Sequence, residues 1–394
     1  SLYTILVQNS DYLTLQNLEV VNTGTERLAH RTGVKVLCEN YGVSHNIILN
    51  ALEIHDVNGS LIKQKGGGSG ILIVNKGQDV ISTFDGLTIE NCIIRRCERN
   101  GMIWSSYSSR NNWHPSTNTV VRKNLIEEVP GDGIVPIGCE GALIEYNLMR
   151  NCPGTLPHSE AAAGFWPWSC DNTVLQFNEV SDHKAPWDAQ GFDSDYNCHN
   201  TTIQYNFSHD NDGGMVLICN SGTDGGVGNQ GTVVQYNVSI NDAIRPRATR
   251  SGIFSATIHI GGPCENTLIN NNILHVNPKT ASFIDRSIIT SDSWDGYANN
   301  TIFKENIFFV CSAGYKKFFH FTACAFKPIK NRYCYGKEGY EYCYKNLAPY
   351  AVAEPKNEKR RYGCCRYCLR SDYNWIKCVF DFFVCVHYNR KQKP

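Results

Sequence analysis

A glycine followed by alternating apolar residues recurs along most of this 394-residue chain. Successive copies begin between 23 and 38 residues apart, and each copy has room for two or three short strands. The repeat glycines are Gly33, Gly70, Gly101, Gly133, Gly164, Gly191, Gly214 and Gly252. A repeat of this length cannot bury its apolar face alone, so neighbouring copies must stack. The pattern therefore predicts a solenoid of stacked strands.

Most copies also contain a short segment of the form NT-x-(I/V)-x-x-N. These segments end at Asn124, Asn147, Asn178, Asn206, Asn237, Asn272 and Asn306. Asn17 and Asn91 fit the same register, and Ala51 replaces the asparagine in one copy. Asparagines stacked at a turn can hydrogen-bond to one another and to the backbone. Because no helical 3.6-residue pattern is present, residues 1–310 are predicted to form an all-β protein, a right-handed parallel β-helix of about eight or nine rungs.

A column of cysteines keeps the same register. Cys139, Cys170, Cys198 and Cys264 each lie eight residues before one of these asparagines. Free cysteine is among the most frequently buried residue types, so this column predicts a stack of small core side chains. Spacing alone does not support disulfides between neighbouring rungs.

The composition changes after residue 310. Residues 311–394 hold 17 Lys+Arg and 6 Asp+Glu, a net charge of +11, and the first 310 residues carry the opposite charge of −11. This tail has 9 of the 18 cysteines and 11 of the 20 tyrosines, and the repeat stops before it. We expect the tail to be out of register and poorly folded, as in a frameshifted translation. Zinc or nucleic-acid binding is the alternative, although the cysteine spacings match no standard zinc finger.

The start of the chain gives less information. The segment Leu2 to Val7 already has the pattern of a strand, so we expect the β-helix to be truncated at this end, with the signal region absent. No apolar run is long enough to cross a membrane.

The outward-facing positions of the repeat are its candidate functional positions. Strand side chains alternate, so residues second and fourth after each glycine should face outward. Most of these residues are apolar, as in the copy after Gly214, where Val216 and Ile218 are the expected outward pair.

Two neighbouring copies differ from the others. Trp166 and Trp168 face outward on one rung, and Asp193 and Asp195 on the next, about 4.8 Å away. Aspartate is a poor strand former, so two aspartates on a strand face indicate a functional role. Exposed indoles can stack on sugar rings, and carboxylates can act as acid, base or metal ligand. This patch is therefore the predicted saccharide site.

Loops near the patch add further polar and aromatic side chains. We expect the catalytic residues to be Asp193, Asp195 and Asp212. We expect substrate binding by Trp166, Trp168, Trp187, Asp188, His209, Asp210, Glu160 and Arg247. The sequence around His209 is also typical of a turn. A similar His-Asp-Val-Asn-Gly turn at residues 55–59, far from the patch, favours that structural interpretation for His209 and Asp210.

With these features the chain resembles the bacterial right-handed β-helix repeat proteins found among carbohydrate-active enzymes. These include pectate-lyase-like folds and β-helical glycoside hydrolases. The resemblance covers residues 1–310 and rests on the asparagine rungs and on segments such as WPWSCDNTVLQFNEVSDH and WDAQGFDSDYNCHNTTIQYNFSHDNDGG. The motifs of the calcium-dependent lyases and the polygalacturonase aspartates with Gly-His-Gly are absent. The resemblance implies a polysaccharide or oligosaccharide substrate and a secreted or periplasmic location, although the many cysteines fit that location less well.

Three functions remain open at this stage. The first is a glycoside hydrolase in which Asp193 and Asp195 are the two carboxylates, with Asp212 as another possible partner and no cofactor. The second is a Ca²⁺-dependent polysaccharide lyase in which the same three aspartates bind the ion. The third is a glycan-binding surface protein without turnover. For each of them we expect a monomer that binds no nucleic acid and does not span a membrane.

Overall fold

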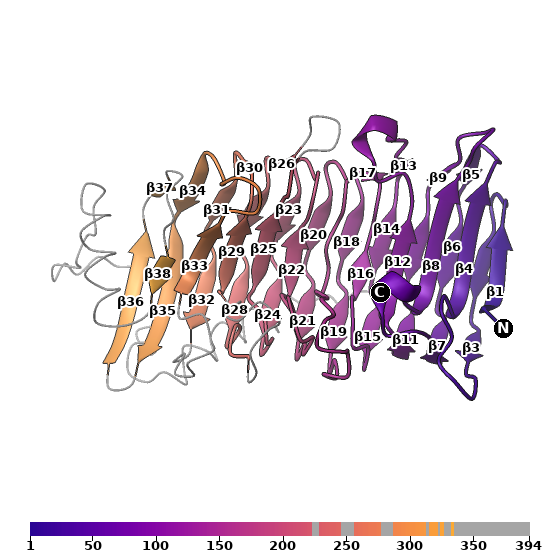
Figure 1. The fold of residues 1–394 in the computed structure, drawn as a ribbon, viewed down its shortest axis with the longest axis horizontal. Helices are drawn as coiled ribbons and strands as arrows, with labels where there is room; N and C mark the ends of the chain where they lie inside the picture. The colour runs from indigo at the N-terminus through magenta and orange to yellow at the C-terminus, as the bar shows by residue number, and fades with distance from the viewer. Residues whose placement is uncertain are drawn as a thin grey trace, which may run out of the picture. The chain divides into compact units, whose positions relative to one another are not determined.

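The computed structural model describes residues 1–222, 228–245, 256–276, 287–312, 315–321, 324–326 and 332–334. Residues 1–352 make up one compact unit and residues 353–394 a second. The second unit lies outside the described residues, so the account below concerns the first. Its backbone winds repeatedly through three parallel sheets (Figure 1). The predicted parallel β-helix is confirmed.

The first sheet, called the wall sheet here, carries the candidate site. Bridges from Phe165 to Ile134 and to Phe192 connect its two runs of strands through the rung at 164–168. Its parallel strands are β1 (Tyr3–Gln8), β4 (Thr32–Glu39), β8 (Ser69–Lys76), β12 (Asn100–Ser105), β16 (Ile134–Val135), β22 (Phe192–Ser194), β25 (Val216–Cys219), β29 (Ile258–Gly261) and β33 (Ser287–Asp292).

The second sheet contains eleven strands among the described residues, ten of them parallel, where the glycines predicted eight or nine rungs. The parallel strands are β2 (Thr14–Gln16), β6 (Ile48–Asn50), β10 (Thr88–Glu90), β14 (Val120–Arg122), β18 (Leu143–Glu145), β20 (Val174–Gln176), β23 (Thr202–Gln204), β27 (Val233–Gln235), β31 (Leu268–Asn270) and β34 (Thr301–Lys304).

The third sheet follows the second around each turn of the chain. Its parallel strands are β3 (Glu19–Asn22), β7 (Glu53–Asn58), β11 (Ile93–Glu98), β15 (Leu125–Glu127), β19 (Leu148–Arg150), β21 (Glu179–Ser181), β24 (Phe207–His209), β28 (Val238–Ile240), β32 (Ile273–Val276) and β35 (Asn306–Ser312).

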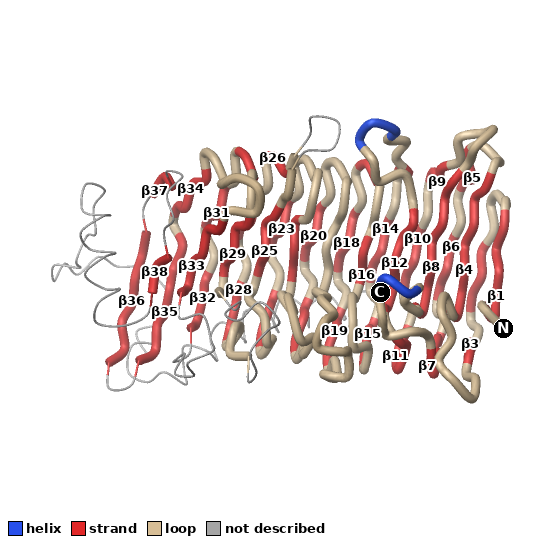
Figure 2. The backbone as a smooth tube through the Cα atoms, in the orientation of Figure 1, coloured by secondary structure: helices blue, strands red, loops and turns tan. Residues whose placement is uncertain are grey.

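Short elements lie between the three sheets. Two 3₁₀ turns, η1 (Lys63–Lys65) and η2 (Arg110–Asn112), are the helical segments drawn in Figure 2. Two small parallel sheets contain β5 (Val43–His45), β9 (Thr83–Asp85), β13 (Ser116–Thr117) and β17 (Cys139–Glu140), and β26 (Asn229–Gln230) with β30 (Cys264–Glu265).

Strand direction changes at the end of the described chain. The last strands are β36 (Tyr315–Phe321), β37 (Cys324–Phe326) and β38 (Arg332–Cys334). They pair antiparallel with β35, β34 and β33, so each of the three sheets ends on a reversed strand. Most of the tail whose sequence departs from the repeat lies outside the described residues, and the frameshift interpretation stays a prediction.

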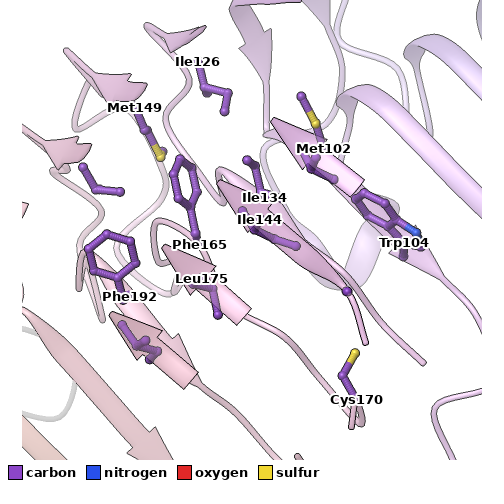
Figure 3. Packing of buried hydrophobic residues seen from close by; sticks show 14 of the residues in the cluster. Met102, Trp104, Ile126, Ile134, Ile144, Met149, Phe165, Cys170, Leu175 and Phe192 are labelled. Carbon is purple, nitrogen blue, oxygen red and sulfur yellow. The ribbon is translucent and has the colours of Figure 1, made fainter. Parts of the chain in front are cut away.

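The core follows from the alternation of side chains. Phe165 and Phe192 point inward from neighbouring rungs, with ring centroids 6.1 Å apart, and Figure 3 shows them near Met149. The repeat glycine next to them has a steric cause, because a Cβ on Gly164 would lie 2.2 Å from the carbonyl oxygen of Gly191. Glycine at this position therefore lets successive rungs approach closely.

The asparagine column forms a buried hydrogen-bonded ladder. Asn178 illustrates the unit: its Nδ2 donates to Oδ1 of Asn206 at 3.0 Å and to the carbonyl of Ile144 at 2.9 Å. Its Oδ1 accepts from the backbone and side-chain N–H groups of Asn147, both at 3.0 Å. The same contacts continue from Asn124 to Asn306. The ladder satisfies the polar groups of each turn inside the core.

The prediction that Asn17 and Asn91 belong to the ladder is wrong by one residue. The N–H of Cys92, rather than that of Asn91, donates to Asn124 Oδ1 at 2.9 Å. Asn17 and Asn91 instead occupy the preceding position, with φ of 57° and 56°. Asparagine is favoured in this left-handed conformation because its short side chain can hydrogen-bond locally. An asparagine at this position therefore resembles a ladder asparagine in the sequence.

The cysteine column is buried as predicted. Cys139, Cys170, Cys198 and Cys264 are all free thiols in the core, and the other cysteines from Cys38 to Cys264 are also free and buried. The backbone N–H of Cys139 lies 3.3 Å from the sulfur of Cys170, consistent with stacking on neighbouring rungs. Asn229 pairs with Cys264 in the rung between Cys198 and Cys264.

Candidate functional site

The candidate site lies on the wall sheet where the rung of Trp166 meets the rung of Asp193. Trp166 is only 4% exposed and packs against Val135 and Ala163, whereas Trp168 is half-buried. The two indole centroids are 6.3 Å apart. The prediction that both indoles are exposed is therefore wrong for Trp166, because other side chains cover it. Trp168 is the indole that keeps an accessible surface.

One of the covering side chains comes from a distant loop. Between β7 and β8 the chain makes the turn η1, and the Lys63 ammonium lies 5.1 Å from the ring centroid of Trp166 and 5.9 Å from that of Trp168. Cation–π contacts of this kind stabilise by about 0.5–2 kcal/mol. The backbone N–H of Lys63 also donates to Glu160 at 2.9 Å. These contacts hold a positive charge over the indoles.

A buried ion network lies behind the indoles. The guanidinium of Arg99 is fully buried and pairs with Asp132 at 3.1 Å and with Glu160 at 3.4 Å. The other Asp132 oxygen accepts from Trp166 Nε1 at 3.1 Å and from the N–H of Ala163 at 3.0 Å. Glu160, expected to bind substrate, therefore belongs to a network that orients Trp166.

Asp193 lies deepest among the wall carboxylates. It is 4% exposed, and within the described part of the chain its Oδ1 has no hydrogen-bond partner. Burial raises the pKa of Asp193 well above its ordinary value, and the negative charges of Asp195, Asp188 and Asp132 add to this effect. A buried carboxyl without a partner is more stable in its neutral form.

Asp195 lies in a better solvated position on the same strand face. Its Oδ1 accepts from the N–H of Tyr196 at 2.7 Å and from the thiol of Cys219 at 3.2 Å. Burial raises the pKa of Asp195 above its ordinary value, although these hydrogen bonds and the charge of Lys63 oppose the rise. The balance favours the ionised form of Asp195 over that of Asp193.

Asp188 approaches from the loop before β22. It has a left-handed backbone, φ 61°, and its carbonyl accepts from Arg245 at 2.7 Å. Burial and then the charges of Asp195 and Asp132 raise the pKa of Asp188 to about 7, despite the opposing charges of Lys63 and Arg245. Three acidic groups with displaced pKa values thus meet on this wall, which is typical of catalytic sites.

Cys219 is part of this cluster, and the sequence did not predict it. The structure pairs Phe192 with Val216 and Asp193 with Leu217, one residue later than the glycine register implies. Val216 therefore faces the core instead of the wall. This rung begins with two glycines, Gly213 and Gly214, and so contains one additional residue. Because strand side chains alternate, a shift of one residue moves each side chain to the opposite face of the strand.

The same shift corrects the expected outward pair. Val216 and Ile218 belong to the core cluster, whereas Leu217 and Cys219 face the wall and pack near Trp187 and Tyr196. Trp187 thus lies beside the carboxylates, in the neighbourhood that the loop sequence suggested.

His209 and Asp210 lie apart from this cluster. His209 is on β24 of the third sheet and pairs with Asp210 at 2.8 Å and Glu179 at 3.3 Å. Burial lowers its pKa, but these two carboxylates raise the pKa of His209 to about 9 overall. His55 makes the same contacts with its own following aspartate at 2.6 Å and with Glu19 at 2.8 Å. The repetition supports a structural role for the His–Asp turn.

The two other predicted residues lie elsewhere. Asp212 lines a small cavity of about 90 Å³ with Gly154, Leu156, His158, Lys184, Pro186 and Arg245. Arg247 lies outside the described residues. The structure therefore brings Asp188, Asp193 and Asp195 together, whereas Asp212 lines a cavity whose Arg245 also contacts the carbonyl of Asp188.

One group of side chains could hold a cation. Single ligand atoms of Asp193, Asp195 and Cys219 lie within 4.8 Å of one another. Two oxygens and a sulfur suit zinc-like ions better than calcium, which takes oxygen ligands. Separately, the described residues contain no helix long and apolar enough to span a membrane.

Comparisons with known proteins agree with this fold. No family model matches the chain. A curated relative named lacto-N-biosidase, from Bifidobacterium longum subsp. longum, is 27% identical over 374 residues, which is 77% of this chain and 22% of the relative. The chain thus spans less than a quarter of the length of that protein.

The solved structures include a GH136 lacto-N-biosidase from Eubacterium ramulus. It superposes with a TM-score of 0.59 and 24% identity, over 78% of this chain and 51% of that chain. Its selenomethionine derivative gives the same values. This similarity concerns the β-helix fold.

Proposed function

We propose that this chain forms the carbohydrate-active part of a glycoside hydrolase that acts on an oligosaccharide. The name lacto-N-biosidase, carried by the similar proteins, denotes such an enzyme. The observation that carries the proposal is the meeting of Asp188, Asp193 and Asp195 on one wall beside the half-buried indole of Trp168. Hydrolysis of a glycosidic bond requires one protonated and one ionised carboxyl group on either side of the bond.

The two roles follow from the environments of the carboxyl groups. Asp188, with a pKa of about 7, is protonated in about half of the molecules at neutral pH and in most of them below it, and it serves as the general acid that protonates the leaving oxygen. Asp195, held by two hydrogen bonds, is the ionised partner, either as nucleophile or as the base that activates water. Asp193 is too deeply buried to contact a sugar, and its raised pKa keeps it neutral. This assignment replaces Asp193 by Asp188 in the predicted catalytic pair.

Sugar binding follows from the indoles. Trp168 offers an apolar face to a sugar ring, and Trp166 supports it from behind. Lys63 stabilises the ionised carboxylates at the edge of the same site. We expect the protein to meet its oligosaccharide substrate in the extracellular or periplasmic space and to act as a monomer.

The lyase alternative has less support. Its calcium ligands were expected to be Asp193, Asp195 and Asp212, but Asp212 lines a different cavity and the third group near the pair is a thiol. Ultraviolet absorbance of an unsaturated uronate product would select the lyase. Binding of oligosaccharide without any turnover would select the third alternative, a glycan-binding surface protein.

The test is hydrolysis of a chromogenic aryl lacto-N-bioside by the purified protein. Asp188→Asn and Asp195→Asn should each lower kcat/KM by about 10²–10⁴-fold, the usual contribution of a catalytic carboxyl group. Asp182→Asn is the matched control, because Asp182 also has a left-handed backbone, φ 53°, but pairs with Lys184 at 3.6 Å outside the cluster. Full activity in both cluster variants would refute the assignment.

A further inference from the structure

The wall holds a side chain that the proposed reaction does not use. Cys219 is 2% exposed and packs with Leu217, near Trp187 and Tyr196. Its thiol donates to Asp195 at 3.2 Å. A thiol with a purely structural role would pack among apolar side chains in the core, as the stacked cysteines of the repeat do. This thiol instead faces a pair of carboxylates.

A second observation concerns Asp193. Its side chain is more than nine-tenths buried, and in the described part of the chain its Oδ1 has no hydrogen-bond partner. That carboxylate belongs to the group whose ligand atoms lie within 4.8 Å of one another. A buried oxygen without a partner is costly, by about 1–3 kcal/mol. A bound cation would remove that cost.

We propose that Asp193, Asp195 and Cys219 form a binding site for a thiophilic divalent cation, with Zn²⁺ and Cd²⁺ as its typical occupants. One sulfur and two carboxylate oxygens supply three ligands, and a water completes a tetrahedron. The ligand atoms must be deprotonated, so the metal displaces the thiol proton of Cys219 and the proton held by Asp193. Calcium and magnesium bind poorly to such a site because they prefer oxygen ligands alone.

The geometry requires only small movements. A tetrahedral zinc with bonds of about 2.0–2.3 Å places its ligand atoms roughly 3.5 Å apart. The sulfur of Cys219 and Oδ1 of Asp195 are already 3.2 Å apart, and the whole set lies within 4.8 Å. A movement of about 1 Å by the Asp193 carboxylate completes the arrangement.

Occupancy has a consequence that rests on the proposed function. The metal uses the carboxylate assigned as nucleophile or base, so micromolar Zn²⁺ should inhibit hydrolysis and a chelator should restore it. Metal binding itself is measured without substrate. A protein that binds the metal but hydrolyses nothing would therefore refute the proposed function and leave the metal site intact.

The test is titration of the intact protein with Cd²⁺ while the ultraviolet thiolate-to-cadmium charge-transfer band is recorded. Cysteines of residues 311–394 can also bind Cd²⁺, so the measured quantity is a difference between variants. The unaltered protein and the control Cys97→Ser, whose thiol is buried in the core five rungs earlier, should each bind one Cd²⁺ per chain more than Cys219→Ser does. The band should be weaker by one Cd²⁺ equivalent in Cys219→Ser, which keeps a donor to Asp195, and Asp193→Asn should weaken binding of that ion at least tenfold.

X-ray absorption at the zinc edge gives a second measurement that needs no variant. One sulfur at about 2.3 Å with oxygens at about 2.0–2.2 Å is the expected shell. A band of unchanged strength in Cys219→Ser, a zinc shell of oxygens alone, or equal competition by Ca²⁺ would each overturn the proposal. If Cys219→Ser does not fold, Cys219→Ala and the absorption spectrum decide the question.

Discussion

Replacing the proposed general acid should stabilise the fold while it removes activity. Burial and neighbouring negative charge raise the pKa of Asp188 from its ordinary 3.8 to about 7. The folded protein therefore binds the Asp188 proton more tightly than the unfolded chain does. Between about pH 4 and pH 7 the folded state carries the extra proton, so the free energy of unfolding falls as pH rises.

The magnitude follows from the same values. A rise from 3.8 to about 7 corresponds to about 4 kcal/mol of destabilisation, reached once the pH exceeds the folded pKa. Asp188→Asn removes the titrating group, and asparagine tolerates the left-handed backbone of this position, φ 61°. The variant should thus equal the unaltered protein near pH 4 and exceed it by up to about 4 kcal/mol at pH 8.

Urea unfolding at both pH values measures the difference. Asp182→Asn, with the same backbone conformation outside the cluster, should change stability by no more than about 0.5 kcal/mol at either pH. An Asp188→Asn protein that is no more stable than the unaltered one at pH 8 would show that Asp188 is ionised without cost and would refute its role as the acid.

Three other predictions concern the ladder, the site charge and the tail. Asn178→Ala leaves buried amide and carbonyl groups of neighbouring rungs without partners and should lower the free energy of unfolding by about 3–6 kcal/mol, measured by urea denaturation. Lys63→Met removes a charge that lowers the pKa of both proposed catalytic carboxyls, so both limbs of the pH profile of kcat/KM should move to higher pH. A chain ending after Cys334 should unfold thermally like the full chain, whereas one ending after Ser312 loses β36, β37 and β38 and should unfold at a lower temperature.

The repeat made the fold predictable, because each rung restates the same constraints. Stacked glycines, asparagines and cysteines specify the sheets without any knowledge of distant contacts. The incorrect predictions of register arise where a residue is determined by its own turn rather than by the repeat. Asn91 satisfies the left-handed backbone of a turn and so imitates a ladder position. The rung that begins at Gly213 and Gly214 contains one additional residue, which moved Cys219 onto the wall and hid it from the sequence pattern.

Other parts of the site depend on contacts that no repeat encodes. Lys63 reaches Trp166 from a loop more than three rungs away, and its N–H contacts a carboxylate 97 positions later in the chain. Arg99 and Asp132 come from separate turns and meet only in the folded protein. The aspartates of the wall were predictable because an aspartate on a strand face has no structural reason to be there. Their division of roles depends on burial, which the sequence does not give.

The most direct test of the account is a crystal structure of the Asp188→Asn variant with a bound oligosaccharide containing a lacto-N-biose unit. The account predicts the scissile glycosidic oxygen within hydrogen-bond reach of residue 188, the anomeric carbon facing Asp195, and a sugar ring stacked on Trp168. A sugar bound in the cavity beside Asp212 and Arg245, with the carboxylate wall empty, would contradict it.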